Sequence, residues 1–212
     1  GIWYTATSGI WQTVWLEPVP KDYIKSFRVQ PREEPNQVYV QVETSLGRSF
    51  DHKLYVRVRQ NGVTVAESSG RVMTPHLLLI NEPHLWTPAD PYLYELEISI
   101  EDQNGAVVDK VDSYLGLRTI ALGKDERGHT RIMLNDKPLF QLGVLDQGYW
   151  PEGLYTAPSE AAMKNDIQVL KDMGFNMIRK HLKVEPARCY HLCDKMGMLV
   201  WQDMPNGTNT DD

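Results

Sequence analysis

The chain has 212 residues and a formal net charge of −6, with 42% hydrophobic and 24% charged residues. This length suits one large domain or two ordinary ones, and the composition is that of a globular protein. The net negative charge does not attract nucleic acid or an anionic membrane surface. No apolar run is long enough to span a membrane, and two cysteines are too few for a disulfide framework. We therefore expect neither a nucleic-acid nor a membrane partner.

Residues 22–121 alternate between apolar and polar side chains, the period-2 pattern of half-buried strands. Asn61-Gly62 and Asn104-Gly105 are tight-turn signals between such segments, and Leu117–Ile120 closes the series. Several short strands separated by turns predict an antiparallel β-sandwich. The clearest inward-facing sets are Val38, Val40 and Val42; Leu54, Val56 and Val58; and Tyr94, Leu96, Ile98 and Ile100.

Beyond residue 140 short apolar runs alternate with helical patterns. Ser159 is a candidate N-cap for the first helix, and Gly174 follows its end. The β-α-β-α-β order predicts a parallel sheet with right-handed crossovers, too short to be a complete α/β domain. The expected elements are strands at 141–145, 176–179 and 198–201, and helices at 160–173 and from Pro186 to Gly197.

Both ends of the chain are abrupt. It opens on Gly1-Ile2-Trp3-Tyr4 without an initiator Met or a signal sequence, and it stops at Asp211-Asp212 after a strand-like run and a polar loop. We therefore expect a fragment of a longer protein.

Three blocks of sequence resemble, in this order, the family 2 glycoside hydrolases, the group of β-galactosidases, β-glucuronidases and β-mannosidases. Ser8–Leu16 is similar to the end of their N-terminal jelly-roll sugar-binding domain. The second block resembles their immunoglobulin-like sandwich and the third the opening of their (β/α)8 barrel. The motifs are Leu85-Trp86-Thr87-Pro88, Pro91–Tyr94 and Gly116-Leu117-Arg118 for the sandwich, and Leu134–Pro138, Gly143-Val144, Gly174–Arg179 and Cys193–Gly197 for the barrel.

The resemblance implies a multidomain, mainly β architecture. Residues 1–21 would be the tail of the jelly roll, residues 22–121 the whole immunoglobulin-like sandwich, and residues 122–212 the first βαβαβ part of a TIM (β/α)8 barrel. The third barrel strand would then be an open edge. We expect 122–212 to be the least stable part, or to be covered by a second copy of the chain in a homo-oligomer.

The resemblance also implies the reaction of the parent protein, the hydrolysis of β-glycosides with retention, most similar to that of a β-galactosidase. Retaining glycosidases use two carboxyl groups about 5–5.5 Å apart. The family places both glutamates after the third barrel strand, so we assign no catalytic residue and expect this chain alone to be inactive. Asn81-Glu82-Pro83 imitates an Asn-Glu catalytic pair, but it lies in the sandwich and is interpreted as a polar loop leaving a strand.

Substrate-binding candidates are the polar residues at the carboxyl ends of the expected barrel strands, where active sites of that fold lie. Asp146 follows the first strand, Arg179 and His181 lie on the second, and Asp203 follows the third. An Arg179 guanidinium could orient a catalytic carboxylate, and a His181 imidazole could bind sugar hydroxyls. The alternatives are a buried ion pair for Arg179 and an ordinary hydrogen-bonded histidine for His181. The surroundings of His181, Asp203 and Asp146 depart from the commoner family pattern, which leaves the sugar open.

Aromatic rings pack against the C–H face of pyranoses, so Trp150, beside Tyr149 in the loop after the first strand, is a fifth binding candidate. The alternative is that these rings cover the edge of the barrel. We interpret four other tryptophans as core or interdomain packing: Trp3, Trp11, Trp15 and Trp86.

No cofactor or metal is expected. Cys189 and Cys193 are four residues apart on the apolar stripe of the second helix, a position typical of core residues and unsuited to a disulfide. The metal-binding HExxH motif, the P-loop and the dinucleotide motif GxGxxG are all missing.

The alternative function is a non-catalytic module, in which the sandwich is a spacer or a carbohydrate-binding unit of a larger assembly. A free-standing sandwich would not need the βαβαβ segment, which favours the enzyme. The location cannot be inferred from the fragment itself; the resemblance implies a periplasmic or secreted parent in a polysaccharide-degrading bacterium.

Overall fold

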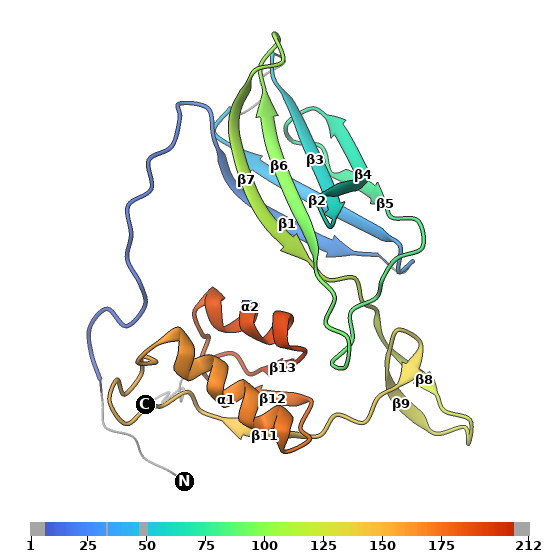
Figure 1. Ribbon diagram of the computed structural model, residues 1–212, viewed down its shortest axis with the longest axis vertical. Coiled ribbons are helices and arrows are strands. Elements are labelled where there is room, and N and C mark those ends of the chain that lie inside the picture. The colour runs from blue at the N-terminus through green and yellow to red at the C-terminus, as the bar shows by residue number, and fades with distance from the viewer. Residues whose placement is uncertain (1–6, 33, 47–50, 206–212) are drawn as a thin grey trace, which may run out of the picture. The chain divides into compact units, whose positions relative to one another are not determined.

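The computed structural model describes residues 7–32, 34–46 and 51–205 (Figure 1). They form two compact units. The sandwich unit contains residues 17–87 and 92–139, and the α/β unit contains the N-terminal segment to Leu16, Pro88–Pro91 and the chain from Phe140 onward.

The sandwich itself is made of two antiparallel sheets (Figure 1), one with the order β1-β2-β5 and the other with the order β4-β3-β6-β7. The predicted β-sandwich is therefore confirmed. Its strands are β1 (Ile24–Pro31), β2 (Gln37–Thr44), β3 (Lys53–Gln60), β4 (Val63–Gly70), β5 (His76–Leu79), β6 (Tyr94–Glu101) and β7 (Val107–Leu115).

One apolar core lies between the two sheets. In β2 and β3 every second residue is buried or nearly so, because alternate side chains of a strand point to opposite faces, whereas in β6 the run Leu96–Ile100 is buried on both faces. Each fully buried aliphatic side chain stabilises the fold by about 1.5–3 kcal/mol, and a slip of one residue in register would expose a whole set. The central members are Val38, Val40, Val42, Leu54, Val56, Val58, Leu96, Ile98 and Ile100.

The turns behave as their residues predict. Asn61 and Gly62 have φ values of 52° and 77°, as a two-residue type I′ turn between β3 and β4 requires. At the other signal, the Asp102 side chain accepts hydrogen bonds from the backbone N–H groups of Asn104 and Ala106. Glu82 lies in the loop after β5, with φ 49°, which confirms the interpretation of Asn81-Glu82-Pro83 as a polar loop.

The segment Leu117–Ile120 does not form the final sandwich strand, so that prediction is wrong. Strand β7 already ends at Leu115, and Leu117 forms an isolated bridge with Leu85. Ile120 instead begins a separate three-stranded sheet of β8 (Ile120–Lys124), β9 (Thr130–Leu134) and β10 (Lys137–Pro138). The Asn135 side chain links this sheet to the buried Trp86, whose carbonyl accepts from Asn135 Nδ2 at 3.1 Å.

The α/β unit contains the predicted parallel sheet, in the order β11-β12-β13 (Figure 1). Helix α1 begins after the N-cap Ser159, whose Oγ accepts from the N–H of Ala162, and α2 ends at Gly197 with φ 77°. Among the described helices, none is long and apolar enough to cross a membrane. The elements are β11 (Gly143–Asp146), α1 (Glu160–Asp172), β12 (Met177–Lys180), α2 (Ala187–Met196) and β13 (Leu199–Gln202).

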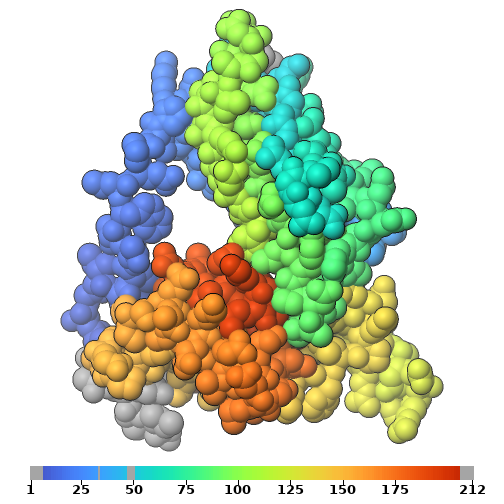
Figure 2. Space-filling view, viewed as in Figure 1, coloured from blue at the N-terminus to red at the C-terminus, as the bar shows by residue number. Residues whose placement is uncertain are grey.

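The two faces of this sheet differ in character. On one face Ile178 joins Ile167, Leu192 and other buried residues of the helices in a small core, and Figure 2 shows α1 in orange directly beside α2 in red. On the other face Leu145, Arg179 and Trp201 pair across the three strands in one row, and all three are exposed. Arg179 therefore points away from the helices.

The tryptophans predicted to pack differ in burial. Trp86 is fully buried, and the partly buried Trp11 makes an edge-to-face contact with Tyr155 at 4.5 Å between ring centroids. Trp15 is 70% exposed and so is not a core residue of its own unit, while its interdomain packing stays a prediction. Trp3 lies outside the described residues.

The sandwich should become less stable in acid because of His76. This side chain is 2% exposed, Ser68 Oγ lies 3.2 Å from its Nδ1, and its Nε2 has no partner among the described residues. Burial lowers the pKa of His76, so the unfolded chain binds the proton more readily. Stability should be complete above about pH 6.5 and fall as the pH decreases toward the folded-state value.

Urea unfolding at pH 7.5 and pH 5 measures this effect. We expect H76L to remove part of the acid-induced loss of stability, whereas H129Q, at a histidine whose side chain is 62% exposed, should keep it. Identical pH slopes for wild type and H76L would contradict the prediction.

Candidate functional site

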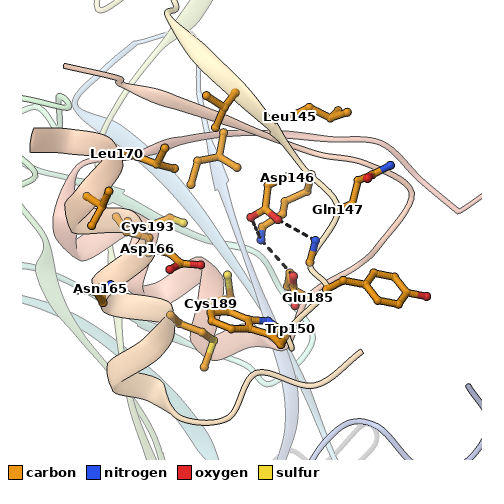
Figure 3. A pocket seen from close by; sticks show the side chains of 18 residues that line it. Leu145, Asp146, Gln147, Trp150, Asn165, Asp166, Leu170, Glu185, Cys189 and Cys193 are labelled. Carbon is orange, nitrogen blue, oxygen red and sulfur yellow. Dashed lines mark hydrogen bonds and ion pairs between the residues drawn. The ribbon is translucent and has the colours of Figure 1, made fainter. Parts of the chain in front are cut away.

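Four charged side chains form an ion-pair network where β11 and β12 end. Lys180 Nζ lies 2.5 Å from Asp146 Oδ2 and 3.1 Å from Glu185 Oε1, and Lys183 Nζ lies 3.3 Å from Glu185 Oε2. Figure 3 shows Asp146 and Glu185 pointing toward the same ammonium. The side chains of Lys180, Lys183 and Glu185 are 7% exposed or less. We refer to Asp146, Lys180, Glu185 and Lys183 as the buried ion-pair network.

The network alternates in sign, so its two positive and two negative charges compensate each other. Removing an ion from water costs several kcal/mol, and only close opposite charges with good hydrogen bonds offset that cost. Burial alone would lower the pKa of Lys180, but the charges of Asp146 and Glu185 raise it above its usual value overall. Burial lowers the pKa of Lys183, with Glu185 opposing the shift.

Lys183 also connects the network to the loop that follows β11. Its ammonium donates to the carbonyl of Gly148 at 2.5 Å and to that of Tyr155 at 2.9 Å, and it lies 4.5 Å from the centre of the Tyr155 ring. Gly148 has φ +67°, and a Cβ there would come within 2.5 Å of Glu185 Oε1 and 2.6 Å of Lys183 Cδ. The left-handed backbone and the close Lys183 and Glu185 side chains therefore favour glycine at this position.

A cavity of about 670 Å³ lies beside the network, between β11 and the two helices. Trp150, Asp146, Lys180 and Glu185 line one part of it (Figure 3). Helix residues supply the rest of the wall, among them Met163, Ile167, Leu170 and Cys189. An aromatic ring beside several charged groups is a lining suited to a polar ligand with an apolar face.

Arg179 and Asp203 form a second charged group. Arg179 Nε lies 3.2 Å and 3.0 Å from the two carboxylate oxygens of Asp203, and its Nη2 lies 2.9 Å from Oδ2. The pair joins β12 to the residue after β13, and the Arg179 side chain is 51% exposed. This fork-shaped contact fixes the plane of the guanidinium while leaving half of its surface accessible.

The five residues predicted from sequence to bind substrate divide into separate groups. Asp146 and Trp150 both line the cavity. Arg179 and Asp203 contact each other and are not part of the cavity lining. His181 follows β12, and its Nδ1 lies 3.3 Å from Nε2 of Gln147.

Sequence reasoning missed Lys180, Lys183 and Glu185, which match no motif. One signal was available: Lys180 lies two residues after Ile178 in a strand, so both side chains must share a face. Since Ile178 belongs to the apolar core, Lys180 had to be a buried cation in need of an anionic partner.

The cysteines lie where the sequence predicts. Cys189 and Cys193 are free and buried in α2. Within the part of the chain that the structure describes, no group of three or more His, Cys, Asp or Glu residues is arranged to hold a metal ion.

Comparisons with known proteins connect the fold to a family. A family model described as "Glycosyl hydrolases family 2" matches residues 22–118. A putative β-glucuronidase of Formosa agariphila is 26% identical over 93% of this chain and 24% of its own length. A β-galactosidase of Lactococcus lactis is 30% identical over 92% of this chain and 19% of its own length.

Solved structures give a consistent result. The β-glucuronidase of Ruminococcus gnavus in complex with D-glucuronic acid superposes with a TM-score of 0.72 at 25% identity, over 88% of this chain and 31% of that protein. The chain thus spans between about a fifth and a third of the length of these relatives.

Replacement of Lys180 tests the energetics of the buried ion-pair network. K180M keeps the length of the side chain but leaves the carboxylates of Asp146 and Glu185 without the cation between them. We expect a loss of about 3–5 kcal/mol in the free energy of unfolding, the usual cost of removing one partner from a buried pair.

Urea unfolding of K180M and of the control K164M, at an exposed lysine of α1, measures the effect. The control should stay within about 0.5 kcal/mol of wild type. An equally small change in K180M would mean that the network does not stabilise the unit.

Proposed function

We propose that this chain is part of a retaining β-glycoside hydrolase of family 2 that acts on β-galactosides. The observation that carries the proposal is the extent of the similarity. The family model matches the sandwich, and similarity to named glycosidases continues over more than nine-tenths of the chain, through the parallel sheet.

We further propose the domain organisation of that enzyme. Residues 1–21 end a jelly-roll domain, residues 22–121 form an immunoglobulin-like sandwich, and residues 122–212 begin a (β/α)8 barrel. Support for the barrel comes from the parallel order β11-β12-β13 with α1 and α2 as crossovers. In a closed barrel the row of Leu145, Arg179 and Trp201, opposite the helices, would face the interior.

The catalytic pair is proposed to lie outside this chain. Asp146 and Glu185 share the Lys180 ammonium, and Asp203 is held by Arg179, so the carboxylates near the ends of these strands already have structural partners. The chain would instead supply binding groups. Arg179, oriented by Asp203, would position a catalytic carboxylate, and His181 would bind a sugar hydroxyl.

The residues at the end of β11 and in the loop after it are also proposed to contact the carbohydrate. Trp150 would stack on the C–H face of a pyranose, and Asp146 would accept hydrogen bonds from its hydroxyls. The sugar is the finer part of the proposal, because similar proteins are named for galactosides and for glucuronides. We propose a β-galactoside as the substrate, and the experiment also measures the hydrolysis of a β-glucuronide.

Two preparations test the proposal with nitrophenyl β-galactoside and nitrophenyl β-glucuronide. The 212-residue chain should show no turnover, because two carboxyl groups about 5–5.5 Å apart are required and the chain is proposed to lack them. The longer protein that contains it should hydrolyse the galactoside with retention of configuration, followed by NMR of the anomeric proton.

Turnover by the 212-residue chain would contradict the assignment of the catalytic pair. If the longer protein preferred the glucuronide, the proposed substrate would be wrong, but the proposed class of retaining β-glycoside hydrolase would still hold. No hydrolysis of any β-glycoside by the longer protein would favour a non-catalytic module.

A further inference from the structure

We infer that Gln147 is a positioning residue that holds the His181 imidazole in the tautomer with its proton on Nε2, and thereby presents a hydrogen-bond donor to a sugar oxygen. The role of this donor rests on the proposed function, in which His181 binds a sugar hydroxyl. The tautomer itself rests only on the geometry of the α/β unit.

The face of the parallel sheet opposite the helices carries a second row of side chains, one step beyond the row that contains Arg179. The parallel pairing continues to this row: the N–H of His181 donates to the carbonyl of Asp146 at 2.9 Å, and that of Asp203 to the carbonyl of Lys180 at 2.9 Å. Residues two apart in an extended strand share a face. The second row therefore lies on the Arg179 side of the sheet, and its members are Gln147, His181 and Asp203.

Two side-chain contacts agree with this placement. The Asp203 carboxylate contacts the Arg179 guanidinium, and Gln147 Nε2 lies 3.3 Å from His181 Nδ1. Figure 3 shows the side chains of Asp146 and Gln147 pointing in opposite directions from the chain, and it is Asp146 that joins the buried ion-pair network. The contact between Gln147 and His181 therefore belongs to the face on which Arg179 lies.

The chemistry of this contact determines where the imidazole proton lies. The amide nitrogen of Gln147 donates and cannot accept, so Nδ1 of His181 must be the acceptor. A neutral imidazole carries one N–H, which then lies on Nε2, the ring nitrogen that does not face Gln147. A doubly protonated ring would place two donors against each other and lose the contact.

The backbone of His181 is already fixed, which leaves the ring as the part that Gln147 controls. The backbone N–H is bound to Asp146, and the next residue, Leu182, has a left-handed φ of 56°, so the chain turns out of the strand at once. Lys183 then enters the buried ion-pair network. These restraints act on the backbone and do not distinguish the two ring nitrogens, whereas the Gln147 amide does.

A donor at Nε2 suits the other groups of this face. The half-exposed Arg179 guanidinium has only donors, and the Asp203 carboxylate already accepts from it. His181 would add a neutral donor, so the sugar oxygens bound here would act as acceptors. With its proton on Nδ1, the ring would instead present an acceptor and require the sugar hydroxyl to donate.

The tautomer is measured on the 212-residue chain by nitrogen–proton correlation NMR of the imidazole rings at about pH 8, where an ordinary histidine is neutral. The spectrum of H181L identifies the signals of His181. We expect the unprotonated nitrogen to be Nδ1 in wild type and in the control Q168L, at an exposed glutamine of α1. Q147L should give averaged signals of both tautomers. Q147E should move the proton to Nδ1, because a carboxylate accepts.

The longer protein that contains this chain shows whether the donor matters for the substrate. Its readouts are KM and kcat for nitrophenyl β-galactoside. We expect Q147L to lower kcat/KM about tenfold, the size of one hydrogen bond, mainly through KM, because the contact is made in substrate and transition state alike. Q168L should match wild type. If Q147L does not fold, Q147A takes its place with the same expectations.

A double variant separates positioning from general stabilisation. If Gln147 acts through His181, adding Q147L to H181L should change kcat/KM by less than about twofold, because the ring that Gln147 orients is already gone. A further tenfold loss in the double variant would overturn the positioning role.

The remaining outcomes separate the inference from the proposed function. A proton on Nδ1 in wild type would overturn the inference, and so would a wild-type kcat/KM in folded Q147L. If the wild-type longer protein hydrolyses no β-glycoside, the proposed function fails and the role of the donor fails with it, whereas the tautomer is still decided on the 212-residue chain.

Discussion

The structure at the carboxyl ends of β11 and β12 depends on one constraint, that a buried ammonium must be fully paired. Lys180 meets it with Asp146 and Glu185, and Glu185 in turn pairs with Lys183. Because each ion needs the next, the four side chains form one unit. Two connections follow. The end of β11 is joined to β12 through Asp146 and Lys180, and the segment after β12 is joined to the loop of residues 148–155 through Lys183.

The alternation of side chains in a strand lets the same three strands serve two purposes. Lys180 lies on the face covered by the helices, and its neighbour Arg179 points to the opposite, open face. On the covered face, charge fixes the strand ends and the loop bearing Trp150. On the open face, Asp203 orients a half-exposed guanidinium. The first arrangement is structural, and the second leaves the Arg179 guanidinium half accessible, as its proposed binding role requires.

The sequence predicted most of the elements because their determinants are local. Ser159 and Gly197 mark helix ends by their own capping chemistry, and Asn61-Gly62 specifies its turn. The segment Leu117–Ile120 was mispredicted because partners distant in sequence, Leu85 and β9, divide it between two structures. The site was predictable only in part for the same reason. Asp146 and Trp150 follow a strand and could be identified, whereas the pairing of Lys183 with two carbonyls of another loop has no signature in the sequence.

The central claim is that the buried ion-pair network acts as one unit, and a double-mutant cycle on its two ends tests it most directly. D146N, K183M and the double variant would be unfolded in urea alongside wild type; no direct hydrogen bond or ion pair links these two side chains in the described structure. We predict that the two effects on the free energy of unfolding fail to add by about 1 kcal/mol or more, because coupling passes through Lys180 and Glu185 and through Gly148, whose N–H donates to Asp146 and whose carbonyl accepts from Lys183. Additivity within about 0.3 kcal/mol would contradict the account.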